Sequence, residues 1–160
     1  MTKYRVKSED RKKFSFTNNT NLIGELTYQQ RYTLKADILL ANGSRYQMAP
    51  KEGDSATTIE LKDNENVLLT FKMNSKGSIS INTKFDNVEQ YYTFKYKEGT
   101  YVLLDIEEVK ELLLIETDFK WNKFDQDYNI STTDKFDKFE SSEILLLSMI
   151  HCINYYQYLS

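Results

Sequence analysis

The sequence predicts a mainly β protein in which about twelve antiparallel strands close into a barrel around a buried C-terminal helix. Three observations predict it. Aromatic residues make up 14 % of the 160 residues while proline occurs once, and aromatic side chains fit a pleated, half-buried surface. Polar and apolar residues alternate along many short segments. After residue 141 this alternation gives way to an almost continuous apolar run.

The strands are predicted from alternation and from the turns between them. Alternation is clearest at 13–17, 57–62, 78–82 and 92–97, where one row of side chains can face a core and the other water. Polar turn sequences recur about every 8 to 12 residues, as in antiparallel barrels and sandwiches. We therefore place about twelve strands between residues 4 and 133, with a type I′ hairpin turn at Asn42-Gly43.

Two segments lack the alternation. The runs 67–69 and 112–115 are continuously apolar, which indicates strands that are covered on both faces. Residues 50–56 are the best candidate for a longer exposed loop.

The helix is expected at about residues 142–158. Ser141 or Ser142 can cap its start, and Glu143 suits the positive end of the helix dipole. Its apolar residues cover nearly the whole circumference, which predicts burial on all sides. A stripe of polar residues can hydrogen-bond to surrounding strands: Ser148, His151, Asn154 and Gln157. Closing the strands around this helix removes open sheet edges and fills the lumen, so we expect a single domain over residues 1–160.

Segments of the C-terminal third carry a family resemblance. They are Phe119-Lys120-Trp121, residues 127–130, Phe136, residues 142–147 and Tyr155-Tyr156. Together they resemble the end of the tubby C-terminal-like superfamily, in particular its LURP-one-related and phospholipid scramblase branch. The resemblance implies a twelve-stranded barrel around a central hydrophobic helix. It also implies membrane tethering or phosphoinositide binding for tubby itself and lipid-related roles for scramblases, but no matching basic pocket motif transfers a site residue.

Several chemistries are excluded by composition or geometry. One histidine and one cysteine rule out a two-histidine metal site and an internal disulfide, and the scattered glycines form no phosphate loop. His151 and Cys152 are neighbours on a helix and point about 100° apart, so they form no nucleophile–base pair. We expect His151 to be buried with its hydrogen bonds satisfied, and we expect no catalytic residue, no metal and no cofactor.

Acidic and aromatic residues near the C-terminus are assigned to structure. The acidic residues lack the spacing of a calcium loop and are expected on solvated strand faces: Asp118, Asp125, Asp127, Asp134, Asp137, Glu140 and Glu143. Aromatic residues here are candidate ligand platforms, but packing in the core or at its rim is expected for them: Trp121, Tyr155, Tyr156 and Tyr158.

One basic cluster is the candidate binding site: Arg5, Lys7, Arg11, Lys12 and Lys13. It suits contact with anionic lipid headgroups or nucleic acid, whereas a solvated terminal segment, diluted by Glu9 and Asp10, is the plainer interpretation. We expect no nucleic-acid partner. The net charge of −3 leads us to expect weak binding to anionic vesicles, or none.

We therefore expect a non-enzymatic binding or adaptor module whose exterior contacts anionic lipid or a protein partner. The alternative is a barrel with a small-ligand or hydrolytic pocket at its mouth, near Trp121 or Tyr155. A filled lumen favours the first, and a cavity of several hundred Å³ with a few convergent polar groups favours the second. The N-terminus shows no secretion signal and no apolar run reaches the length of a membrane span, so we expect a cytoplasmic location.

Overall fold

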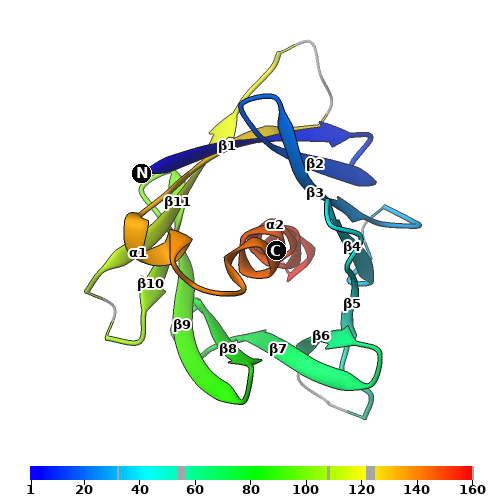
Figure 1. Ribbon diagram of the computed structural model, residues 1–160, viewed down its shortest axis with the longest axis vertical. Coiled ribbons are helices and arrows are strands. Elements are labelled where there is room, and N and C mark those ends of the chain that lie inside the picture. The colour runs from blue at the N-terminus through cyan, green and yellow to red at the C-terminus, as the bar shows by residue number, and fades with distance from the viewer. Residues whose placement is uncertain (32, 54–56, 108, 122–124, 160) are drawn as a thin grey trace.

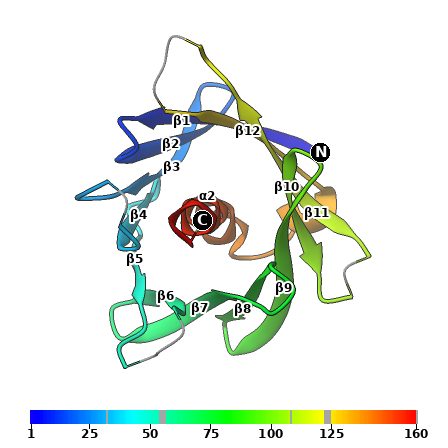
Figure 2. The same cartoon turned by 180° about the vertical axis from the view of Figure 1, so that it is seen from behind.

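Strands of the described chain form a closed antiparallel barrel around one long helix in this computed structural model (Figures 1 and 2). The structure describes residues 1–160 except 32, 54–56, 108, 122–124 and 160, so the second half of the predicted loop at 50–56 lies outside the described residues. The strands are β1 Thr2–Glu9, β2 Lys13–Asn18, β3 Asn21–Thr27, β4 Ala36–Leu40, β5 Arg45–Pro50, β6 Ile59–Asp63, β7 Asn66–Met73, β8 Ile79–Phe85, β9 Val88–Lys97, β10 Thr100–Asp105, β11 Glu111–Asp118 and β12 Asp127–Thr132. The predicted fold class is confirmed.

The order of strands gives the barrel two distinct mouths. Each strand pairs with the next in sequence, and β1 pairs with β12 to close the barrel. Connections after even-numbered strands therefore lie at one end, together with α1 (Asp134–Asp137) and the start of α2 (Ser142–Leu159). We call this end, from which Figure 1 is viewed, the upper mouth. Connections after odd-numbered strands and the end of α2 lie at the opposite end, the lower mouth, which is nearer the viewer in Figure 2.

The lumen is filled by α2. Every residue from Ile144 to Ile153 is buried, and so is Tyr155. Inward side chains of the strands, such as Phe16 and Phe71, complete the core around them. A helix that is apolar all round is stable in water only with such a cover, which explains why the barrel closes on it.

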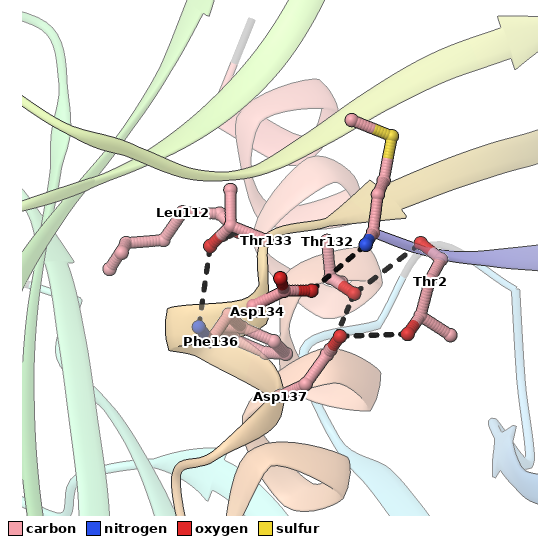
Figure 3. A network of polar contacts seen from close by, with 8 residues as sticks. Thr2, Leu112, Thr132, Thr133, Asp134, Phe136 and Asp137 are labelled. Carbon is pink, nitrogen blue, oxygen red and sulfur yellow. Dashed lines mark hydrogen bonds and ion pairs between the residues drawn. The ribbon is translucent and has the colours of Figure 1, made fainter.

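A polar network at the upper mouth ties the closing seam to α1 (Figure 3). Asp137 accepts hydrogen bonds from the hydroxyl groups of Thr2 on β1, at 2.7 Å, and Thr132 on β12, at 2.6 Å. Thr133 caps α1 by accepting a hydrogen bond from the backbone N–H of Phe136 at 3.3 Å. This short helix was not predicted from the sequence. Its one sequence signal is the capping threonine followed by Asp134.

The two continuously apolar runs reflect β-bulges, so the prediction that they are covered on both faces was wrong. On β11, Leu113 pairs with Leu103 while Glu111 pairs with Leu104, which leaves Leu112 as the extra residue. An extra residue breaks the alternation, so Leu112 and Leu113 are both buried. The register between β6 and β7 shifts in the same way beside 67–69.

Asn42-Gly43 does form a hairpin, but the turn differs from the predicted type. Only Gly43 has a positive φ there, 93°, and its N–H donates to the Leu40 carbonyl at 2.9 Å. The Asn42 side chain instead accepts a hydrogen bond from the N–H of Ser44 at 2.9 Å. Because the connection is four residues long, it takes a type I turn followed by a left-handed glycine rather than the two-residue type I′ form.

Candidate functional site

Basic side chains gather at the lower mouth. Its six connections come from parts of the chain that are far apart in the sequence, and among their described residues seven cations accompany four anions. The cations are Arg11, Lys12, Arg31, Lys35, Lys51, Lys76 and Lys120, and the anions are Asp10, Glu52, Glu98 and Asp125. The lower mouth is therefore a basic rim.

The upper mouth has the opposite charge. Between β12 and the first turn of α2, and in the other connections at this end, the described anions are Glu65, Asp86, Glu107, Asp134, Asp137, Glu140 and Glu143. The described cations are Lys110, Lys135 and Lys138. The net charge of −3 thus conceals a barrel that is basic at one mouth and acidic at the other. This arrangement complements the α2 dipole, whose negative end lies at the lower mouth.

The predicted basic cluster lies along the β1–β2 hairpin, but ion pairs occupy part of it. Arg5, on the outer face of β1, has its Nη2 atom 3.0 Å from Oδ2 of Asp118. Lys13, at the start of β2, has Nζ 3.5 Å from Oε1 of Glu25. Lys7 lies on the outer face of β1, and Arg11 and Lys12 lie in the connection.

Sequence reasoning missed the cations that come from other connections. Lys35, Lys51 and Lys76 have no ion-pair partner within the described part of the chain, and neither do Lys7 and Lys12. Arg31 is paired with Asp10, and Lys120 with Asp118. The available signal was strand parity: in an up-and-down barrel, every second turn lies at the same end.

Exposed aromatic side chains lie among the basic residues of the lower mouth, in the β11–β12 connection. Phe119 is 71 % exposed and Trp121 is 88 % exposed, one on each side of Lys120. At the end of α2, Tyr158 and Leu159 are also exposed. The expectation that Trp121 packs in the core or its rim was therefore wrong, whereas Tyr155 is in the core as expected. Nothing in the local apolar pattern distinguishes a tryptophan in a long connection from one in a strand.

Two buried carboxylates hold the β11–β12 connection, which carries Phe119 and Trp121, beside the β1–β2 hairpin. Asp125 accepts hydrogen bonds from Oγ of Ser8, at 2.7 Å, and from the N–H of Arg11, at 3.1 Å. Asp127 accepts from the N–H of Ser8 at 2.9 Å. Both aspartates are buried, so the prediction of solvated strand faces was wrong for these two. Their role is to join the β1–β2 and β11–β12 connections, because a buried carboxylate requires several donors.

A cavity of about 310 Å³ opens at the lower mouth, between the end of α2 and the side of the barrel formed by β1, β2 and β12. Its polar lining comes from Ser8, Arg11, Thr33, Gln126, Asn154 and Gln157, and its aromatic lining from Phe14, Tyr28, Tyr128 and Tyr158. Neither Trp121 nor Tyr155 lines it, in contrast to the predicted position of a mouth pocket.

Beneath the cavity, His151 is held neutral inside the fold. Its Nε2 atom lies 3.1 Å from the carbonyl oxygen of Leu34, and its Nδ1 atom lies 2.5 Å from the hydroxyl of Tyr28. The carbonyl can only accept, so Nε2 carries the proton and Nδ1 accepts from Tyr28. Burial lowers the pKa of His151 to about 4 and raises the pKa of Tyr28. His151 is 0 % exposed with both ring nitrogens bonded, which confirms the predicted structural role.

Comparison with models of known protein families, with curated proteins and with solved structures found no match. Within the described residues, no group of three or more histidine, cysteine, aspartate or glutamate side chains could hold a metal ion. None of the described helices is long and apolar enough to cross a bilayer.

Proposed function

We propose that this chain is a binding module of the tubby-like group, and that its lower mouth contacts anionic membrane surfaces. The observation that carries the proposal is the exposure of Phe119 and Trp121 on a rim of lysine and arginine. Aromatic side chains favour the interface between lipid and water, and each basic residue near an anionic leaflet contributes about 1 kcal/mol. The two contributions act on the same face, because Asp125 and Asp127 fix the loops side by side.

The net negative charge does not oppose this contact. Charges more than about 10 Å from the bilayer are screened at 0.1 M salt, and the acidic mouth lies at the far end of the barrel. The charge that a membrane meets is that of the lower mouth. The low overall pI of about 5.3 is therefore a poor guide to the behaviour of this face.

Vesicle co-sedimentation tests the proposal. Vesicles of phosphatidylcholine with phosphatidylserine should sediment the protein, vesicles of phosphatidylcholine alone should not, and added salt should weaken binding. The double change Lys12→Glu and Lys51→Glu should abolish binding, because it reverses two lower-mouth cations without an ion-pair partner among the described residues.

A matched control changes the same charge at the other end. Lys84 and Lys138 are exposed near the upper mouth, and changing both to glutamate should leave sedimentation unchanged. Equal loss in the two double variants would mean that net charge alone drives the association, and absence of binding at low salt would remove the lipid hypothesis.

A second candidate function rests on the lower cavity, whose lining brings together Arg11, Asn154 and Gln157. We propose that such a group of polar side chains accepts a small ligand, for which a cavity of about 310 Å³ is at the lower end of the usual size range. The soluble headgroup glycerophosphoserine is a suitable probe. It should raise the melting temperature of the wild type but not of Gln157→Leu, and no shift in the wild type would contradict this function for that headgroup.

A further inference from the structure

The upper mouth carries a second cavity, larger than the lower one. Its volume is about 640 Å³, and it lies between the β8–β9 hairpin, the β10–β11 connection and the segment that leads from α1 into α2. Its apolar lining includes Phe85, Tyr92, Leu112, Phe139 and Leu145. This volume is in the middle of the range of small-molecule and side-chain pockets.

Exposed apolar side chains continue this lining onto the surface. Val88 is 56 % exposed, Tyr91 47 % and Ile106 63 %, and all three line the same cavity. They come from the β8–β9 hairpin and the β10–β11 connection, which lie on two sides of the opening. Apolar patches rimmed by polar residues are characteristic of interaction sites on soluble proteins.

The rim of this cavity is acidic. Asp86, Asp105, Glu107 and Glu140 line it, against Lys110 and Lys135. The carboxylate of Asp105 accepts hydrogen bonds from the N–H groups of Val109 and Lys110, at 3.2 and 3.3 Å, and so shapes the loop. The carboxylates of Asp86, Glu107 and Glu140 complete the acidic rim.

Two of these acids are held against each other. The pKa of Glu140 is raised by the side chain of Asp86, first through a hydrogen bond to it and second through the repulsion between the two carboxylates. When both carboxyl groups are ionised, a cation that lies between them offsets their mutual repulsion. An ammonium or guanidinium group would relieve this repulsion, whereas a phosphate would add to it.

From this geometry we infer that the upper mouth docks a segment of a partner protein that carries an apolar side chain flanked by lysine or arginine. The apolar side chain would fill the 640 Å³ cavity and the basic flanks would meet the acidic rim. An anionic membrane does not fit this face, because the same rim would repel it. The inference is independent of lipid binding at the lower mouth and would make the barrel a two-ended adaptor.

An NMR titration tests the inference with a defined probe. The acetylated, amidated peptide Lys-Lys-Phe-Leu-Lys-Lys should shift amide resonances of the β8–β9 hairpin and the β10–β11 connection in the ¹⁵N-labelled chain. Two control peptides separate charge from apolar contact: Glu-Glu-Phe-Leu-Glu-Glu and Lys-Lys-Ser-Ser-Lys-Lys should each leave these resonances in place. Equal shifts with either control, or none with the basic apolar peptide, would overturn the inference.

Substitutions that do not strain the backbone show whether the peptide contacts the acidic rim. Asp86 has a positive φ of 52°, which asparagine tolerates, so Asp86→Asn with Glu140→Gln removes charge without strain. We expect roughly three- to thirtyfold weaker binding, from two exposed ion pairs. Asp63→Asn with Glu65→Gln makes the same charge change outside the cavity and should bind as the wild type does.

The apolar part of the contact is tested by a second variant and its matched control. Ile106→Ser should weaken binding because Ile106 lines the cavity, whereas Val109→Ser should not, because Val109 is exposed in the same loop but does not line it. Sedimentation of the chain alone tests a competing occupant. Self-association that both Trp121→Ser and Ile106→Ser abolish would assign the cavity to the lower mouth of a second copy, and would overturn the proposed partner.

Discussion

The hydroxyl oxygen of Tyr28 lies 2.5 Å from Nδ1 of His151, and this contact joins the residue that follows β3 to the middle of the buried helix. The same oxygen accepts a hydrogen bond from Nδ2 of Asn154 at 2.8 Å. Two polar residues of α2 are thus satisfied by one side chain of the barrel wall. The contact also sets the direction of donation, since a neutral His151 that donates to Leu34 must accept from Tyr28.

Removing that hydroxyl should destabilise the fold. Tyr28→Phe leaves Nδ1 of His151 without its donor inside the barrel, which should lower the free energy of unfolding by about 1–3 kcal/mol. Urea unfolding measures the change. Tyr91→Phe removes the hydroxyl of a tyrosine that is 47 % exposed and should change stability little. A loss that is the same in both variants would contradict the role given to Tyr28.

Stability should depend on pH through His151. Its pKa is about 4 in the fold and about 6.5 when unfolded, so the unfolded state binds the extra proton between these values. The contribution of neutral His151 to the free energy of unfolding is then complete above about pH 6.5. It is lost as the pH falls to about 4, and the loss amounts to about 3 kcal/mol in all. The difference in unfolding free energy between the wild type and His151→Gln, followed across this window, isolates the histidine. A difference that does not change with pH would contradict the assignment.

Gly24 marks the closest approach of β3 to its surroundings. A Cβ atom at this position would lie 2.8 Å from the carbonyl oxygen of Leu39 and 3.0 Å from Cδ2 of Leu147 on α2. Because the first of these is backbone, Gly24→Ala should lower the free energy of unfolding by about 1–3 kcal/mol. Gly77 has open space around its added Cβ but a positive φ of 81°, so Gly77→Asn should be tolerated. Calorimetric melting of both variants distinguishes crowding from a general effect of replacing glycine.

The central helix should be indispensable. Leu146→Ala should cost about 2–5 kcal/mol because the closed barrel cannot collapse onto the cavity, and Leu146→Asp should prevent folding. Leu159→Ala, on the same helix but 44 % exposed, should change stability by less than about 0.5 kcal/mol. Deleting residues 141–160 should give insoluble protein, since the inner apolar rows would face water. A soluble truncation that melts cooperatively would contradict the role of α2 as the core.

The fold was predictable from the sequence because its strongest signals are local. Alternation fixed the strands, and the apolar circumference of 142–158 distinguished a covered helix from a surface one. The exceptions are residues whose burial depends on a contact with a residue far away in the sequence. Leu112 and Leu113 are both buried because of a bulge opposite β10, and Asp125 is buried because Ser8, far away in sequence, donates to it.

The candidate sites were predictable only in part. Lys7, Arg11 and Lys12 lie close together in the sequence, so the basic cluster could be found. Lys35, Lys51 and Lys76 join that face only through the closed topology, and no sequence window contains them together. The upper cavity depends on contacts between β8–β9 and the segment after α1, which a sequence pattern does not record.

The fluorescence of Trp121 tests the membrane proposal most directly, because it is the only tryptophan in the chain and lies on the proposed contact. With phosphatidylserine-containing vesicles its emission should shift to the blue and become protected from iodide, and both changes should reverse on adding salt. Phosphatidylcholine vesicles should produce neither. Vesicles that sediment with the protein while the emission and iodide quenching of Trp121 stay unchanged would show that another face binds, and would contradict the account.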